Sequence, residues 1–191
     1  MANFPSYKIS TMTYVCKFSD VVDTKSFYEA NVNKEIDPEF YIENKLTKMN
    51  KKGVLVKSFG NQITIKSKLK KYNIKLFSNG KIQMTGIKSV EDTLHIESKL
   101  HTIFNTEVID MRMVMMNVTF KISSQPVHLY NVFDVLVGEE KVVYYTPEIY
   151  PGLKLKYNKS TAMLFATGSI IISSGDSRDI ADITNILGKI I

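Results

Sequence analysis

The sequence has few of the residue types from which covalent and metal-bound structure is built. It contains one cysteine, Cys16, which excludes an intramolecular disulfide and a cysteine-based zinc site. The three histidines, His95, His101 and His128, do not have the spacing of metal ligands on one helical face. We therefore expect structural roles for these histidines, no metal site and no cofactor.

Long apolar runs and targeting signals are also missing. No apolar run approaches the ~18–20 residues that a membrane-spanning helix needs. The N-terminus lacks the basic, apolar and small-residue order of a signal peptide. We expect an intracellular protein that does not associate with membranes.

Signatures of catalysis are absent as well. There are no clustered carboxylates, no cysteine–histidine pair and no glycine-rich loop that would cradle a phosphate. The sequence therefore predicts a non-enzymatic protein.

The overall composition is that of a soluble globular protein. The 191 residues are 44% hydrophobic and 23% charged, with a formal net charge of +6. Such a length suits one domain, or two small ones that share a core. The positive charge permits binding to a polyanion but is explained equally well by a solvated, lysine-rich surface.

One motif occurs twice. "LFSNGKIQMTG" begins at Leu76 and "LFATGSIIISS" at Leu164, so the two phenylalanines lie 88 residues apart. Each copy is followed by an apolar pattern of helical period. The first of these helices starts at Ser89 with a sequence that resembles a capping box. The apolar stripes predict that each helix covers one face of a sheet.

The two halves also begin alike, with strand-like runs at residues 8–18 and 111–122. Each half then reads as a helix, four strands and a long helix, the first strand being "GVLVKSF" in one half and "KVVYYTPEIY" in the other. The pattern predicts a duplicated α+β unit, with repeats at 1–106 and 107–191. The polar segment 31–52 is interpreted as an inserted surface loop or short helix, or as a partner-binding element.

Three stretches resemble the TATA-box-binding protein family. "YTPEIYPGL" (145–153) is similar to its second-repeat stirrup motif, "LFSNGKIQMTGIKSVED" (76–92) to its Gly-Lys turn, and "TMTYVCKF" (11–18) to its first strand. The resemblance covers nearly the whole chain. It implies a pseudo-twofold saddle, with a curved ten-stranded antiparallel sheet below and helices on the convex face. It also implies binding in a widened minor groove, with aromatic wedges that kink the duplex.

The resemblance places the wedge pairs at Phe59 with Phe77 and at Tyr150 with Phe165. Rings at strand rims can enter base steps, whereas rings in the middle of strands cannot. The alternative is that these rings belong to the core. The other positions assigned to the DNA surface are Tyr7, Ile9, Lys66, Lys75, Lys81, Gln83, Thr85, Met111, Met113, Asn117, Lys156, Met163, Ile171 and Ser173.

Several of these positions depart from the family pattern. Tyr7 and Met111 occupy the places of two asparagines near the pseudo-dyad, and Lys75 and Gln83 replace apolar residues of the groove floor. The first long helix is acidic where the family's is basic. We expect a preference for A/T-rich, easily kinked sites, with relaxed discrimination under Gln83 and Asn117, whose carbonyls could accept from guanine.

The resemblance implies a transcription initiation factor that bends promoter DNA and recruits a transcription factor IIB-like protein and RNA polymerase. Glu148 and Ile149 match the partner-binding positions. The alternative from another class is a protein-interaction scaffold of the same fold that bends DNA weakly or not at all. The A/T-biased composition suits a large DNA virus or a fast-evolving eukaryote. The expected location is the nucleus, or a cytoplasmic viral factory or virion.

Overall fold

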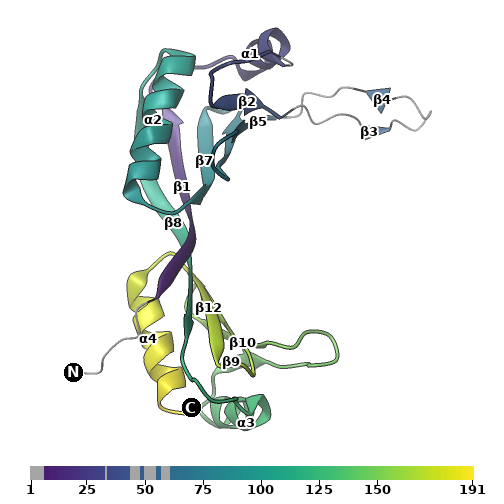
Figure 1. Ribbon diagram of the computed structural model, residues 1–191, viewed down its shortest axis with the longest axis vertical. Coiled ribbons are helices and arrows are strands. Elements are labelled where there is room, and N and C mark those ends of the chain that lie inside the picture. Colours follow the sequence, from purple (N-terminus) through teal and green to yellow (C-terminus); the bar gives the residue numbers. More distant parts are fainter. Residues whose placement is uncertain (1–6, 33, 44–47, 50–54, 57–60) are drawn as a thin grey trace. The chain divides into compact units, whose positions relative to one another are not determined.

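The computed structural model describes residues 7–32, 34–43, 48–49, 55–56 and 61–191. In this part, the strands are β1 (Lys8–Phe18), β2 (Phe40–Ile42), β3 (Lys48–Met49), β4 (Leu55–Val56), β5 (Gln62–Ser67), β6 (Asn73–Phe77), β7 (Lys81–Ile87), β8 (Val108–Lys121), β9 (Val142–Tyr144), β10 (Leu153–Tyr157), β11 (Ser160–Leu164) and β12 (Ser169–Ser174). The helices are α1 (Thr24–Asn31), α2 (Val90–Phe104), α3 (Leu129–Gly138) and α4 (Ser177–Gly188) (Figure 1).

Ten of these strands form one sheet in the order β2-β5-β6-β7-β1-β8-β12-β11-β10-β9. β3 and β4 form a separate two-stranded sheet. The predicted α+β class and ten-stranded sheet are therefore confirmed. The predicted order of a strand, a helix, four strands and a long helix is found in the second half, whereas six described strands lie between α1 and α2 in the first half, four of them in the large sheet.

The chain folds into two compact units. The first-repeat unit comprises Thr13–Met113, and the second-repeat unit combines the described residues up to Met12 with Val114–Ile191. The first strands of the two repeats, β1 and β8, therefore each contribute residues to both units. The repeat boundary predicted at residue 106 concerns homology rather than packing and stays a prediction.

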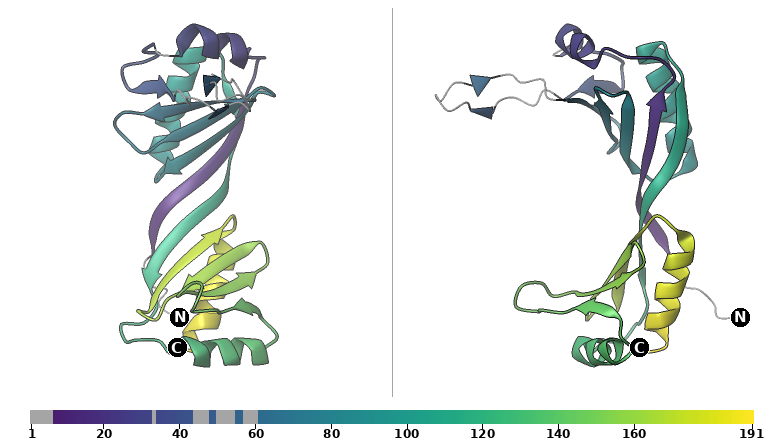
Figure 2. Two further views of the ribbon diagram at one scale, coloured as in Figure 1. Left: turned by 90° about the vertical axis from the view of Figure 1, so that its right-hand side faces the viewer. Right: turned by 180° about the vertical axis from the view of Figure 1, so that it is seen from behind.

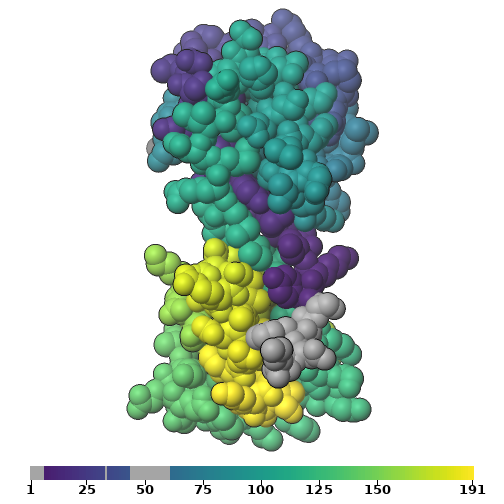
Figure 3. Space-filling model, turned by 90° about the vertical axis from the view of Figure 1, so that its left-hand side faces the viewer, coloured from purple at the N-terminus to yellow at the C-terminus, as the bar shows by residue number. Residues whose placement is uncertain are grey.

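In the first-repeat unit, α2 lies on one face of the strands (Figures 1 and 3). Ile74, Met84, Ile96 and Leu100 are buried between the sheet and this helix. Ser89 caps α2, because its Oγ accepts a hydrogen bond from the backbone N–H of Asp92 at 3.3 Å, as its position predicts. We call the face of these strands that points away from α2 the open face (Figure 1).

The second-repeat unit repeats this arrangement with α4, drawn in yellow in Figure 3. Leu164 and Ile172 from the sheet are buried with Ile183 and Leu187 from the helix. The connection from β9 to β10 (residues 145–152) extends on the side of the sheet away from α4, and both views in Figure 2 agree on this. The open face of this unit is therefore the side on which the predicted stirrup lies.

One expectation about the first half is wrong, since segment 31–52 contains β2, a strand that pairs with β5 at the edge of the large sheet. Within the run "GVLVKSF", Leu55–Val56 forms β4, which pairs with β3, and the other residues of the run lie outside the described residues. Segment 31–52 is therefore not only an inserted loop or helix. Phe40 and Ile42 explain the difference, because their burial anchors a strand too short to show a clear period.

No helix in the described part of the chain is long and apolar enough to cross a membrane.

Candidate nucleic-acid interface

The turn after each predicted wedge phenylalanine has the same geometry in both repeats. Phe77 ends β6 and Phe165 follows β11, and each backbone carbonyl accepts a hydrogen bond of 2.9 Å from a glycine three residues later. Those glycines, Gly80 and Gly168, have φ angles of 78° and 76°, which favour glycine. The repeated Gly position therefore sets how each phenylalanine leaves its strand.

Tyr150 and Phe165 form the predicted second-repeat pair. Their rings meet edge to face, with centroids 6.1 Å apart and an interplanar angle of 63°. Tyr150 is 46% exposed, so the pair is not part of the core. Phe59 lies outside the described residues, so the first-repeat pair stays a prediction, although Phe77 is half-buried at the end of its strand.

Gly152 allows these two rings to pack together. A Cβ at this position would lie 2.8 Å from Cε1 of Tyr150 and 3.0 Å from Cε1 of Phe165. On the other side of Tyr150, the Thr146 carbonyl accepts hydrogen bonds of 3.0 Å from the backbone N–H groups of Ile149 and Tyr150. A tight turn and a close-packed glycine thus fix the ring of Tyr150.

The open face of the first-repeat unit is polar. Strand register places Lys75 on β6 beside Gln83 on β7. In the next row, Asn73 on β6 lies between Lys66 on β5 and Thr85 on β7. Side chains on alternate positions of these strands, such as Ile74 and Met84, are buried under α2. The structure therefore brings Lys66, Lys75, Gln83 and Thr85 onto one surface, as predicted.

The same face of the second-repeat unit holds an apolar pair, Met163 and Ile171, flanked in its row by Lys154 and Thr119, and a polar row beside it. In the first row, Met163 lies beside Ile171 and Lys154. The second row runs Lys156, Thr161, Ser173, Asn117. The structure therefore places Lys156, Met163, Ile171, Ser173 and Asn117 together.

A hydrogen bond fixes the orientation of Asn117. The Ser173 hydroxyl donates to Asn117 Oδ1 at 2.5 Å. The bond turns the carbonyl oxygen toward Ser173 and leaves both hydrogens of the amide Nδ2 to donate.

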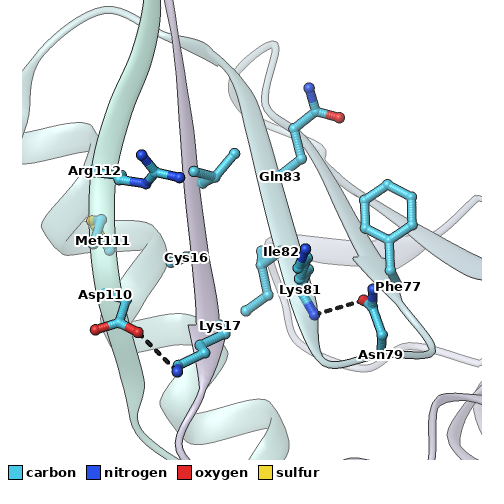
Figure 4. A pocket seen from close by; sticks show the side chains of 11 residues that line it. Cys16, Lys17, Phe77, Asn79, Lys81, Ile82, Gln83, Asp110, Met111 and Arg112 are labelled. Atoms are coloured by element: carbon cyan, nitrogen blue, oxygen red, sulfur yellow. Dashed lines mark hydrogen bonds and ion pairs between the residues drawn. The ribbon is translucent and has the colours of Figure 1, made fainter.

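A hollow of about 850 Å³ opens beside β7 in the first-repeat unit (Figure 4). Its lining residues are Val15, Cys16, Lys17, Phe77, Asn79, Lys81, Ile82, Gln83, Asp110, Met111 and Arg112. The hollow thus joins four predicted surface residues, Phe77, Lys81, Gln83 and Met111. Lys17 is held by Asp110 at 2.9 Å, whereas Lys81 and Arg112 take part in none of the ion pairs between described residues. Two cations therefore remain available here to an anion.

Cys16 also borders this hollow, but its thiol is unreactive. Burial, with a smaller contribution from the nearby Glu97 carboxylate, raises the pKa of its thiol to about 12. The thiol therefore stays protonated at neutral pH and is a poor nucleophile.

Acidic residues neutralise three of the lysines in and after β5. Lys66 is bonded to Glu43, Lys68 to Glu35 at 2.6 Å, and Lys70 to Asp92 at 2.7 Å. Of these, Lys66 was assigned to the DNA surface, so its role there competes with an internal partner.

The remaining predicted residues are more scattered. Tyr7 is 43% exposed just before β1, Ile9 is half-buried in that strand, and Met113 is half-buried in β8. Glu148 and Ile149 are exposed in the β9–β10 connection, with Ile149 at 84%. That exposure leaves both partner-binding candidates free for contact.

Some residues on the open face were missed from the sequence. Lys154, Thr161 and Thr119 share rows with predicted residues, and strict strand alternation from Lys156 and Met163 would have found the first two. Arg112 was missed because Asp110 has a φ of 56°, which interrupts the regular alternation of β8.

Two of the three histidines have structural partners. His95 Nε2 lies 2.6 Å from Glu39 Oε2, and His101 Nδ1 lies 3.1 Å from the Thr106 carbonyl. Among the described residues no group of three or more histidine, cysteine, aspartate or glutamate side chains could hold a metal ion.

Comparison with known proteins agrees with this geometry. No protein-family model matches the chain. A curated protein from Acanthamoeba polyphaga mimivirus, described as TATA-box-binding protein-like, is 28% identical over 90% of this chain. The chain spans 60% of the length of that relative.

Among solved structures, the chain is similar to Methanococcus jannaschii TBP, with a TM-score of 0.68 and 20% identity over 97% of both chains. The resemblance to the TATA-box-binding protein family is therefore confirmed, and the chain is TATA-box-binding protein-like in sequence and has the fold of that family.

Proposed function

We propose that this protein is a non-enzymatic transcription initiation factor that binds and bends A/T-rich promoter DNA through the minor groove. The open faces of both units lie against the groove floor. Aromatic rings at the strand rims enter base steps and kink the duplex.

The Tyr150–Phe165 pair is the observation that carries this proposal. Two large rings pack against each other at the rim of a sheet, one of them nearly half exposed, over a glycine that leaves them just enough room. A pair that only filled a core would be buried. Unstacking a base step costs a few kcal/mol, and a preformed wedge loses little side-chain entropy when it is inserted.

Charge on the open faces supports contact with phosphates. Lys75, Lys81 and Arg112 in one unit, and Lys154 and Lys156 in the other, take part in none of the ion pairs among described residues. Lys156 lies 5.5 Å from the centre of the Tyr144 ring, which positions its ammonium group without neutralising it. Such free cations release counterions when they meet a duplex.

The proposal extends to partners. The exposed Glu148 and Ile149 contact a transcription factor IIB-like protein, which in turn recruits RNA polymerase. The protein acts where promoters are transcribed, in the nucleus or in the cytoplasmic factory of a virus. The TATA-box-binding protein-like name of the mimivirus relative supports this assignment.

The test is DNA bending by fluorescence energy transfer between the ends of a duplex. Phe77→Ala and Phe165→Ala should each reduce the bend angle and weaken specific binding while the protein stays folded. Leu94→Ala is the control, since this apolar side chain is exposed on α2. Unchanged bending by a folded Phe77→Ala/Phe165→Ala double variant would contradict the minor-groove proposal.

A protein-interaction scaffold is the second candidate. The polar Lys75–Gln83 pair and the neutralised Lys66 favour it, because a groove floor usually presents apolar side chains to bases. A binding assay at low salt separates the two candidates: a scaffold would retain no duplex from a random pool.

A further inference from the structure

The two repeats carry opposite chemistry at matching places. Lys75 and Gln83 are cross-strand neighbours on β6 and β7, and Met163 and Ile171 are cross-strand neighbours on β11 and β12. Each residue of the first pair lies 88 positions before its counterpart, the same offset that relates Phe77 to Phe165. The backbone register is therefore shared, and only the side chains differ.

Met163 and Ile171 form a surface without strong hydrogen-bonding groups. In the minor groove, a G·C pair differs from an A·T pair chiefly by the guanine N2 amino group. Facing Met163 and Ile171, that amino group would lose its water and gain no acceptor. This pair therefore rejects G·C.

Lys75 and Gln83 offer the opposite environment. Gln83 has both a carbonyl oxygen, which can accept from guanine N2, and an amide that can donate to adenine N3 or thymine O2. Lys75 donates to the acceptors that every base pair presents in the minor groove. This pair therefore tolerates both kinds of base pair.

The Asn117–Ser173 bond adds selectivity to the second repeat. Because Ser173 occupies Asn117 Oδ1, the asparagine presents N–H donors to the groove. Donors match the acceptors of A·T pairs and meet the guanine amino group as a second donor. This changes the expectation for Asn117, because the bond takes one of the two lone pairs of its carbonyl oxygen and turns that oxygen toward Ser173.

We infer that the second-repeat unit demands A·T pairs beneath Met163, Ile171 and Asn117, whereas the first-repeat unit accepts G·C beneath Lys75 and Gln83. The DNA site is then half strict and half degenerate, and its sequence sets the direction in which the protein binds. This inference rests on the proposed minor-groove function.

Selection from randomised duplexes with the full chain tests the inference. The expected result is a site with one A/T-restricted half and one half that holds G·C freely. In follow-up titrations, a G·C pair in the strict half should weaken binding by about tenfold or more, within the range for a mismatch at a specific contact. The same change in the other half should weaken it by less than about threefold.

Exchange variants connect the two halves of the site to the side chains. Lys75→Met/Gln83→Ile should make both halves strict, and Met163→Lys/Ile171→Gln should make both degenerate. Ser173→Ala should relax discrimination at one base pair, because it lets the Asn117 amide turn its carbonyl toward a guanine, whereas Ser173→Thr keeps a hydroxyl and should preserve the discrimination. Thermal melts check that each variant is folded.

The outcomes are distinguishable. Retained DNA with equally strict halves, or with equally degenerate halves, would overturn this inference and leave minor-groove binding standing. A pool from which nothing is retained at low salt would overturn the proposed function and this inference with it. The wild-type selection alone decides between these outcomes if an exchange variant does not fold.

Discussion

Lys66, on β5, donates a hydrogen bond from its Nζ to Oε1 of Glu43, the residue that follows β2. This bond is the main cause that raises the pKa of Lys66 above its ordinary value. The side chains of Lys66 and Glu43 remain 35% and 28% exposed, so the pair lies within reach of solvent and of a ligand. A phosphate that approaches Lys66 must therefore compete with a carboxylate of the same chain.

Glu43→Gln should strengthen DNA binding, because it releases Lys66 to a phosphate. We expect a gain of up to about fivefold in affinity at low salt, in keeping with the small free energy of an exposed ion pair. The slope of log K against log salt should steepen by about 0.9, the value for one additional phosphate contact. Fluorescence anisotropy across a salt series measures both quantities.

Glu29→Gln is the matched control, since it removes the same charge from exposed α1. If both variants gain equally, the effect comes from net charge and Lys66 does not contact DNA.

Gly152→Ala should reduce bending without unfolding the protein. The added Cβ would lie 2.8 Å from Tyr150 and 3.0 Å from Phe165, so one ring must leave its position in the pair. Gly138→Ala is the control, because nothing lies within 4 Å of a Cβ there. Energy-transfer assays measure the DNA bend angle with both variants. A Gly152→Ala protein that bends DNA like wild type would show that the ring pairing is irrelevant to the kink.

The sequence was sufficient to predict the repeated part of the fold. Three local signals each predict a structure that the packing reinforces. They are the 88-residue offset, the Ser89 cap, and the alternation of Ile74, Leu76, Ile82 and Met84. β2 was missed because its three residues carry no period. The sequence instead predicted a strand at the run that contains β4.

The site was predicted less completely, because its chemistry depends on pairs that are distant in sequence. The resemblance assigned Lys66 to the DNA surface, but no local pattern reveals that Glu43 holds it. Likewise, the role of Asn117 depends on Ser173, which strand register brings opposite it from 56 residues away. Such partners follow from the topology of the sheet rather than from propensity.

Glu148→Arg should leave DNA binding nearly intact and block a ternary complex with a transcription factor IIB-like protein. Glu148 is exposed in the β9–β10 connection, where reversing a charge disfavours a partner more than it disturbs the fold. Gel-shift assembly with a candidate partner measures the loss. Glu29→Arg, on α1, controls for the change in charge. Normal ternary assembly by Glu148→Arg would assign the partner surface elsewhere.

Stability at acid pH should depend on Asp92, at the start of α2. Its Oδ1 accepts hydrogen bonds from Lys70 Nζ at 2.7 Å and from the Tyr72 hydroxyl at 2.5 Å, and its Oδ2 accepts from the Lys88 N–H at 2.9 Å. Burial alone would raise the pKa of this carboxyl group. The hydrogen bonds outweigh burial and hold its pKa well below the ordinary 3.8.

A carboxylate whose pKa is depressed by folding stabilises the protein fully above its unfolded pKa. That contribution is lost as the pH falls below 3.8 toward the folded pKa. Asp92→Asn should therefore lower the free energy of unfolding by about 2 kcal/mol at neutral pH, the scale of hydrogen bonds to a charged group. Its effect should shrink as the pH falls below about 4. Urea titrations of wild type, Asp92→Asn and the exposed-site control Asp134→Asn measure this. Parallel pH profiles for wild type and Asp92→Asn would show that the charge of Asp92 does not stabilise the start of α2.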